Sequence, residues 1–237
     1  MKTAVIQFPG SNCDLDTIHV LRNVVNVEAD LIWHKDLLNI SDYDAFFLPG
    51  GFSYGDSLRA GIIAAYSPIM QKVKDAAKEG IPIIGICNGF QILVESELLP
   101  GALLENDNLK FICSWIFLKN QSNRTPFTIN MAEDQIIHIP IAHGEGRYFI
   151  DSESLKELYE NDQIIFKYSS RDGDLDKKYN PNGSLDNIAG ICNLEGNVLG
   201  LMPHPERASE RILDPVGRND GKIFFESLIN FIKKKRL

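Results

Sequence analysis

The segment from Ile81 to Gln91 constrains the fold more than any other part of this 237-residue chain. The run Ile81–Ile86 is apolar and mostly β-branched, which is typical of a buried strand, and it stops at Cys87. The following Gly85-Ile86-Cys87-Asn88-Gly89 spacing is that of a nucleophile elbow, a sharp strand-to-helix turn with small residues beside the nucleophile. Such a turn aims the sulfur at the N-terminus of the next helix, where N–H groups and the helix dipole stabilise a thiolate.

An inert Cys87 is the alternative interpretation of the same residues. Most free cysteines are buried and pack as small hydrophobes, and a strand end is an ordinary place for one. The pentapeptide therefore leaves a catalytic and a structural cysteine open, and partner groups elsewhere in the chain must decide between them.

Strand and helix patterns alternate through the first half of the chain. Predicted strands and helices in this half are, in order, Thr3–Phe8, Leu15–Val25 (helix), Glu28–Trp33, Ala45–Leu48, Ser57–Tyr66 (helix), Ile69–Glu79 (helix) and Ile81–Ile86. This alternation predicts an α/β fold with a doubly wound, mostly parallel sheet. Ligands of such sheets bind beyond the carboxyl ends of the strands.

The second half has a different pattern. Shorter runs at 111–119, 127–130 and 136–142 predict antiparallel strands, an excursion from the main sheet. A helix near 154–160, a strand at 163–168, a hairpin of 188–192 and 198–201, and a final helix near 222–234 follow, with an exposed loop at 169–184. Because no long linker or repeat occurs, we expect one domain spanning residues 1–237.

Composition excludes several classes of partner. The formal net charge is −8 and the pI about 5.2, which argues against a nucleic-acid surface. No apolar run approaches the roughly 20 residues that span a bilayer, and no signal peptide is evident, so we expect a cytoplasmic protein without a membrane partner. The four cysteines lie far apart without a C-x-x-C pair, and no metal site is expected.

A cysteine nucleophile needs a base and a group that orients the base, and His204 with Glu206 supplies both. Pro203 and Pro205 fix an extended backbone around His204, so the side chains two positions apart can lie together. A rigid turn with two polar side chains is the alternative. Of the other histidines, His143 is also placed just after a predicted strand.

An oxyanion needs N–H groups aimed at the developing charge. The Pro49-Gly50-Gly51 turn ends a strand next to the elbow, and its glycines allow the amide of Gly51 to face the site. The amide of Asn88, directly after the nucleophile, is the second expected donor. A plain β-turn is the structural alternative for residues 49–51.

The Gly-Gly turn, the Cys-x-Gly-x-Gln elbow and the late His-Pro-Glu, in that order, resemble the class I glutamine amidotransferases, which have a flavodoxin-like fold. Longer segments extend the resemblance over nearly the whole chain and narrow it to one branch, the glutaminase subunits of phosphoribosylformylglycinamidine synthase. These segments are Phe8–Asp14, Pro49–Gly61, Ala142–Phe149, Asn180–Gly190 and Gly200–Ala208. The Ser114-Trp115 loop departs from the branch, where a more basic residue is expected before the tryptophan.

The resemblance implies that Cys87 attacks the side-chain amide of glutamine, with His204 and Glu206 completing a catalytic triad. Gln91, one helical turn after Cys87, is then expected to contact substrate glutamine. The backbone at Gly144 and Glu145 resembles the clamp for the amino-acid end of that substrate.

The resemblance also implies partners. Ammonia passes to a large synthetase subunit that binds ATP, Mg²⁺ and formylglycinamide ribonucleotide in purine synthesis, and a small accessory subunit bridges the two. No cofactor is expected in this chain, which has no G-x-x-x-x-G-K-[ST] loop. Rival hypotheses are a cysteine hydrolase of the intracellular-protease type, whose members tend to carry histidine where Asn88 stands, a glutaminase serving another synthetase, and a binding module with an inactive site.

Overall fold

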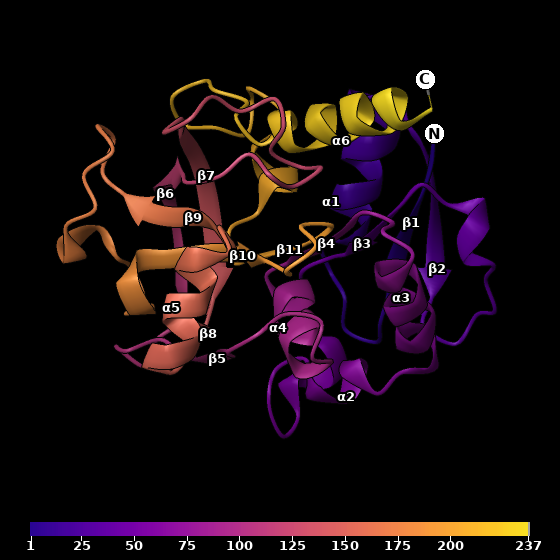
Figure 1. Ribbon diagram of the computed structural model, residues 1–237, viewed down its shortest axis with the longest axis horizontal. Coiled ribbons are helices and arrows are strands. Elements are labelled where there is room, and N and C mark those ends of the chain that lie inside the picture. Colours follow the sequence, from indigo (N-terminus) through magenta and orange to yellow (C-terminus); the bar gives the residue numbers. More distant parts are fainter. Residues whose placement is uncertain (237) are drawn as a thin grey trace.

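A nine-stranded sheet runs through the molecule, seen in a computed structural model that describes residues 1–236 (Figure 1). In spatial order its strands are β2 (Glu28–Trp33), β1 (Lys2–Gln7), β3 (Ala45–Leu48), β4 (Ile83–Ile86), β11 (Val198–Leu201), β10 (Ile188–Cys192), β9 (Ile164–Ser169), β6 (Ile112–Asn120) and β7 (Ile136–His143). The pairs from β2 to β11 are parallel, and those from β11 to β7 are antiparallel.

Helices cover both faces of the parallel half, as the sequence predicts. In Figure 1, α1 (Asp14–His19) and α6 (Lys222–Lys235) lie above these strands, and α3 (Pro68–Lys78) and α4 (Asn88–Glu95) lie below them. The strands between them are apolar on both sides: every residue of β3 and β4 is buried. The doubly wound arrangement is therefore confirmed.

Smaller elements complete the chain. A two-stranded antiparallel sheet pairs β5 (Ala102–Glu105) with β8 (Glu145–Phe149), and α5 (Ser152–Glu160) follows it. The remaining short helices are a π-helix at Val20–Val24, which continues α1, the four-residue α2 (Ile62–Ala65), and 3₁₀ turns at Ile40–Asp42, Ser53–Asp56, Lys177–Tyr179, Leu185–Asn187 and Pro205–Ala208. The predicted antiparallel strands at 111–119 and 136–142 are β6 and β7, and they extend the main sheet at its edge.

Two predicted elements are wrong in part. The helix expected over Ser57–Tyr66 is reduced to α2, because Leu58 (φ +67°) and Gly61 (φ +82°) have left-handed backbone conformations that no helix contains. The strand expected at Phe127–Asn130 is a series of turns, in which Thr128 N–H donates to the Thr125 carbonyl and the two threonine hydroxyls bond each other.

The topology gathers four loops at one edge of the sheet. Neighbouring strands β1, β3, β4 and β11 are parallel, so their carboxyl ends lie side by side. Cys13 lies in the loop after β1, Gly50 and Gly51 lie two and three residues after β3, Cys87 directly follows β4, and His204 lies three residues after β11. This edge is therefore the place where a ligand is expected to bind.

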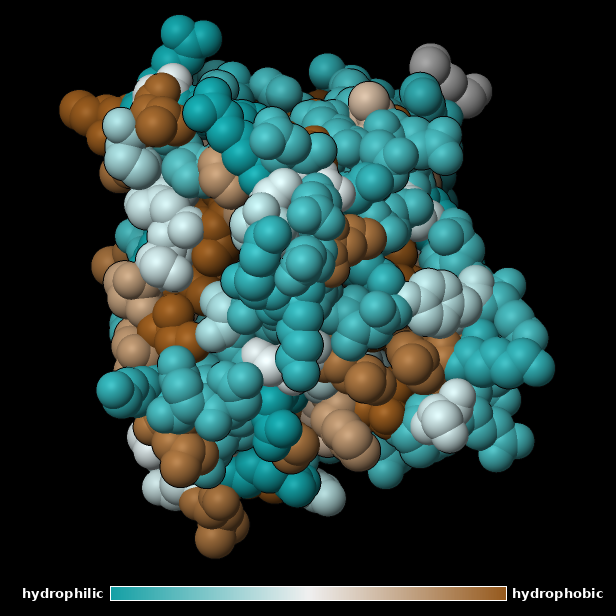
Figure 2. Space-filling model, turned by 90° about the vertical axis from the view of Figure 1, so that its left-hand side faces the viewer, coloured by the Kyte–Doolittle hydropathy of each residue, from teal (hydrophilic) through white to brown (hydrophobic). Residues whose placement is uncertain are grey.

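One side of the molecule is seen in space-filling form. The side shown in Figure 2 is mainly hydrophilic, with separate hydrophobic patches between charged and polar residues. Among residues 1–236, none of the helices has the length and apolar character that a bilayer crossing requires.

Candidate active site

Cys87 occupies a strained turn between β4 and α4. Its backbone has φ +51° and ψ −106°, and its carbonyl accepts the N–H groups of Phe90 and Gln91 at 3.0 and 3.1 Å, which begins the helix. Its own N–H donates to the Leu201 carbonyl at 2.8 Å, which fixes the turn to β11. A non-glycine residue in such a conformation stores about 1–3 kcal/mol of strain, and strain of this kind gathers at functional sites.

Two glycines make the elbow sterically possible. A Cβ atom on Gly89 would lie 1.9 Å from the Leu48 carbonyl oxygen, and one on Gly85 would lie 2.6 Å from the Gly89 carbonyl oxygen. The helix therefore approaches the backbone of both β3 and β4 closely at these glycines. The elbow predicted from the G-x-C-x-G spacing is the one that the structure contains.

His204 and Glu206 form a buried pair beside this elbow. The Nδ1 atom of His204 lies 2.6 Å from Oε1 of Glu206, and the two residues are 1% and 2% exposed. The His204 N–H donates to the Pro140 carbonyl, which fixes the backbone of the pair against β7. Glu206 belongs to the 3₁₀ turn Pro205–Ala208, so the contact is made across the start of a helical turn and not along an extended chain.

The charges around His204 favour its protonated form. Burial lowers the pKa of the imidazole, but the Glu206 carboxylate and the neighbouring Cys87 sulfur outweigh this and hold the pKa well above its usual value. An imidazolium can stabilise a thiolate beside it and can give a proton to a leaving nitrogen. Its orientation is set by the hydrogen bond to Glu206.

A small gap over Gly50 separates the thiol from the imidazole. A Cβ atom on Gly50 would lie 2.8 Å from Cε1 of His204 and 3.4 Å from Cβ of Cys87, so only glycine leaves this space open. The Sγ atom of Cys87 is 3.6 Å from the Ala142 carbonyl oxygen, and among the described residues Nε2 of His204 has no hydrogen-bond partner. Both groups thus face the space in which an amide could react.

The Gly51 turn is fastened to the loop that follows β1. Asn12 N–H donates to the Gly50 carbonyl at 3.3 Å, and Phe52 N–H donates to the Gly10 carbonyl at 2.9 Å. Gly51 and Ser11 form an isolated antiparallel β-bridge between these two bonds. Because they are a non-hydrogen-bonded pair, the N–H of Gly51 points away from Ser11. Gly51 lines the same cavity as Cys87 and His204, which suits its predicted role as a donor.

Asn88, Gln91 and Glu145 are brought together in one chain of hydrogen bonds. Asn88 Oδ1 accepts from Ser53 N–H at 3.1 Å, Asn88 Nδ2 donates to Gln91 Oε1 at 2.8 Å, and Gln91 Nε2 donates to the Glu145 carbonyl at 2.6 Å. Gly144 lies next in the chain to this carbonyl. The amide of Gln91 is thus engaged by the protein itself, and its contact with a substrate stays a prediction.

His143 lies close to the site but has a different character. Its Nδ1–H donates to Oδ1 of Asn106 at 3.0 Å, and the ring packs against the backbone of Gly146. Burial, with a smaller effect from His204, lowers the pKa of His143 to about 4. His143 is therefore neutral at pH 7, and His204 is the better candidate for proton transfer.

Comparison with known proteins agrees with this geometry. A family model described as a CobB/CobQ-like glutamine amidotransferase domain matches residues 1–232. Subunit PurQ of phosphoribosylformylglycinamidine synthase from Methanosarcina mazei is 52% identical over 232 residues, 98% of each chain, and PurQ of Moorella thermoacetica is 53% identical over 231 residues, 98% of this chain and 96% of the relative. The chain belongs to the PurQ family. It is a glutamine amidotransferase.

A solved relative extends the agreement to three dimensions. The structure of PurLQS from Thermotoga maritima contains a chain that is 43% identical and superposes with a TM-score of 0.84, covering 98% of both chains. The fold predicted for this PurQ family member is therefore confirmed.

The cavity beside Cys87 and His204 is small. Its volume is about 60 Å³, and it is lined by Asn12, Cys13, Gly51, Phe52, Cys87, Phe111, Ala142, His204 and Arg207. A single water occupies about 30 Å³ of liquid, and pockets for small molecules usually have 300 Å³ or more. None of the three predicted substrate-binding residues lines this cavity; they are Gln91, Gly144 and Glu145.

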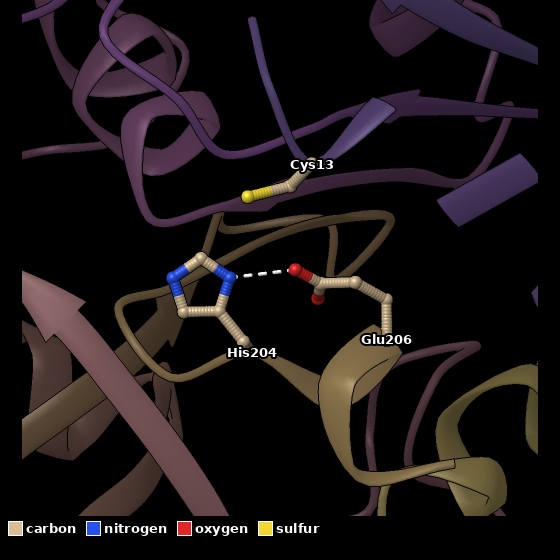
Figure 3. Close-up of side chains that lie close together, drawn as sticks. All are labelled: Cys13, His204 and Glu206. Carbon is tan, nitrogen blue, oxygen red and sulfur yellow. Dashed lines mark hydrogen bonds and ion pairs between the residues drawn. The ribbon is translucent and has the colours of Figure 1, made fainter. Parts of the chain in front are cut away.

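Cys13 is a site residue for which the sequence analysis predicted no role. Figure 3 shows its sulfur directed toward the imidazole of His204. Cys13 is 2% exposed, and burial raises the pKa of its thiol. Its position after the first strand of a parallel sheet is the one signal that could have marked it.

A larger cavity of about 510 Å³ adjoins the small one and shares Ala142, His204 and Arg207 with it. Trp115 lines this larger cavity and packs against the ring of His138. Trp115 and Ser114 lie within strand β6, so the expectation of a loop at this position is wrong. The alternating strand pattern of β6 places Trp115 on the wall of the site.

Proposed function

We propose that this chain hydrolyses glutamine to glutamate and ammonia with Cys87 as nucleophile, His204 as acid and base, and Glu206 as the group that orients the imidazole. The observation that carries this proposal is the strained elbow cysteine facing the same gap as a buried, carboxylate-paired histidine. A binding module with an inactive site gives no reason for a left-handed cysteine opposite such a pair.

The reaction has two stages. The Cys87 sulfur attacks the side-chain amide carbon of glutamine, and the N–H groups of Gly51 and Asn88 stabilise the oxyanion. His204 donates a proton to the leaving nitrogen, and ammonia departs. Water then attacks the γ-glutamyl thioester while His204 accepts its proton, which releases glutamate and restores the thiol.

The ammonia is proposed to pass to a synthetase subunit. The PurLQS structure of the Thermotoga relative names an assembly of three kinds of subunit, and the curated relatives are subunits of phosphoribosylformylglycinamidine synthase. We assign the ATP- and Mg²⁺-dependent conversion of formylglycinamide ribonucleotide to the partner, with a small accessory subunit between the two. Four free cysteines suit the reducing cytoplasm, where we place this reaction.

A nitrogen-labelling experiment tests the whole proposal. The chain is assembled with synthetase and accessory subunits of a close relative and supplied with ATP, formylglycinamide ribonucleotide and glutamine labelled with ¹⁵N in its side-chain amide. We expect the label in the amidine nitrogen of the product, measured by mass spectrometry.

The matched control replaces glutamine by an ammonium salt. Cys87→Ala should abolish product formation from glutamine but retain it from ammonium, because the variant removes only the ammonia source. Glutamine-dependent product formation by Cys87→Ala, or label transfer to free ammonia without any product, would contradict the proposal.

A further inference from the structure

Cys13 brings a second thiol to the triad that glutamine hydrolysis does not use. Its sulfur, one imidazole nitrogen of His204 and one carboxylate oxygen of Glu206 all lie within 4.8 Å of one another (Figure 3). All three residues are buried, with exposed fractions of 2%, 1% and 2%. A thiol, an imidazole and a carboxylate are the three ligand types that Zn²⁺ takes in proteins.

The spacing of these atoms is close to that of a zinc site. Zn–S distances near 2.3 Å and Zn–N distances near 2.0 Å at tetrahedral angles place neighbouring ligand atoms about 3.5 Å apart. The His204–Glu206 contact of 2.6 Å must lengthen by about 1 Å, and the thiol, which lies within 4.8 Å of both partner atoms, must approach by up to about 1.3 Å. Side-chain rotation can supply such movements without a change of the backbone.

An unpartnered oxygen gives a separate indication of a ligand. Within residues 1–236, Oε2 of Glu206 is buried and has no hydrogen-bond partner. Buried polar atoms are normally hydrogen-bonded, and each exception calls for an explanation. A cation beside this pair would satisfy lone pairs that the protein leaves free.

We propose that Cys13, His204 and Glu206 form an inhibitory site for a zinc-like divalent cation. The Cys13 thiol loses its proton on binding, and the metal takes the place of the proton that joins His204 to Glu206. A water completes the tetrahedron as the fourth ligand. The bound form cannot use His204 as acid or base; this inhibition rests on the proposed function, whereas the binding itself does not.

The three ligand types also determine which metal ions the site prefers. Thiolate and imidazole favour Zn²⁺ and Co²⁺, whereas Mg²⁺ prefers oxygen ligands in octahedral geometry. The Mg²⁺ needed by an ATP-using partner should therefore leave this site empty, and the two metals can be present together without competition.

Titration of the full chain with Co²⁺ tests the site without reference to activity. Co²⁺ replaces Zn²⁺ in such sites and gives visible bands of tetrahedral geometry together with a thiolate-to-metal band in the near ultraviolet. We expect both kinds of band in the wild type, and their displacement by Zn²⁺ but not by Mg²⁺. A phosphine reductant keeps the thiols reduced without binding the metal.

Variants assign the ligands. Cys87→Ala, which cannot hydrolyse glutamine by the proposed route, should retain the thiolate band, and so should Cys113→Ser, which removes the exposed cysteine. Cys13→Ser should lose the thiolate band and weaken Zn²⁺ binding at least about 100-fold. If Cys13→Ser does not fold, judged by circular dichroism, Glu206→Gln serves instead and should weaken Zn²⁺ binding while keeping the thiolate band.

Three results would overturn the site: an octahedral spectrum without a thiolate band in the wild type, unchanged bands in Cys13→Ser, or bands lost in Cys87→Ala alone. The last result would assign metal binding to the elbow cysteine. In none of these cases would the nitrogen-labelling experiment change, so failure of the metal site and failure of the proposed function are distinguishable.

Discussion

At the scale of single residues, the geometry of the site depends on glycine, which has no side chain, as much as on the side chains of the candidate catalytic residues. Gly50 has no side chain at the point where Cys87 and His204 approach each other, and a Cβ atom there would lie 2.8 Å from the imidazole. Real Cβ atoms do not approach other atoms so closely, so the ring would have to move. The separation of thiol and imidazole is therefore set by one glycine.

Gly50→Ala is predicted to lower glutaminase activity about 100-fold while the protein stays folded, because displacement of a catalytic group by about 1 Å has an effect of this size. Steady-state glutamine hydrolysis in the assembled complex measures the activity, and thermal unfolding monitors the fold. Gly217→Ala is the control, since nothing lies within 4 Å of a Cβ atom there. Equal activities of the two variants would contradict the prediction.

His143 should make the stability depend on pH. Its pKa of about 4 in the folded chain lies below the ordinary histidine value of 6.5, so the unfolded chain binds a proton first as the pH falls. Stability is lost between about pH 6.5 and pH 4, and the loss between pH 7 and pH 5 is roughly 2 kcal/mol.

The comparison of His143→Asn with the wild type isolates this effect. Free energies of unfolding in urea at pH 7 and pH 5 give one difference for each protein, and the difference should be smaller in the variant by about the same 2 kcal/mol. An identical pH dependence in both proteins would show that His143 is not held neutral by the fold.

Sequence patterns singled out the three candidate catalytic residues because each stands in a local motif: Cys87 lies between two glycines, His204 lies between two prolines, and Glu206 follows the second proline. Cys13 stands in no such pattern, since its neighbours in space are residues 191 and 193 positions away along the chain. Ligand spacing along the chain, which argued against a metal site, cannot reveal a cluster that only the sheet assembles.

At the scale of elements, the elbow is held by contacts between backbone atoms. Gly89 lies against the Leu48 carbonyl and Gly85 lies against the Gly89 carbonyl, so α4 approaches the backbone of β3 and β4 closely at these two glycines. The position of Cys87 is thus fixed by the packing of three elements.

Gly89→Ala should destabilise the protein by at least about 2–3 kcal/mol, because the new methyl group would overlap a main-chain oxygen that cannot move alone. Gly80→Ala is the matched control: Gly80 follows α3 with φ +70° and open space around it, so only about 1 kcal/mol is expected. Chemical denaturation of both variants gives the two values. A loss below 1 kcal/mol at Gly89 would show that the elbow can relax.

The elements that the sequence mispredicted share a physical cause. The helix expected at Ser57–Tyr66 is interrupted because Gly61 packs against the backbone of Ile92, a contact made only in the folded chain. The strand expected at Phe127–Asn130 has β-forming residues, but threonine side chains close turns there and Phe127 is buried against Phe47. In both cases, contacts made in the folded chain override the secondary structure that the local sequence pattern favours.

At the scale of the whole molecule, the order of the strands makes the site. Strands far apart in sequence, β1, β3, β4 and β11, lie next to one another and deliver one loop each to the same edge. The doubly wound half of the sheet was predictable from alternating patterns, whereas the insertion of β11 beside β4 is a long-range pairing that no local pattern indicates.

The small cavity beside Cys87 predicts dependence on partners. Its volume of about 60 Å³ is below that of pockets that bind small molecules, so we expect the space beside the thiol to widen when glutamine binds. We expect the isolated chain to hydrolyse glutamine poorly and the synthetase and accessory subunits to raise kcat/KM at least about tenfold, equal to about 1.4 kcal/mol of transition-state free energy. Strong activity of the lone chain, unchanged by partners, would contradict this.

Covalent labelling tests the central claim most directly. The assembled complex is incubated with a glutamine-mimicking diazo-ketone, and the labelled peptides of this chain are mapped by mass spectrometry. The account predicts a single modification at Cys87, absent from Cys87→Ser and prevented by excess glutamine. Modification of Cys13, Cys113 or Cys192 in its place would contradict the assignment of Cys87 as the nucleophile.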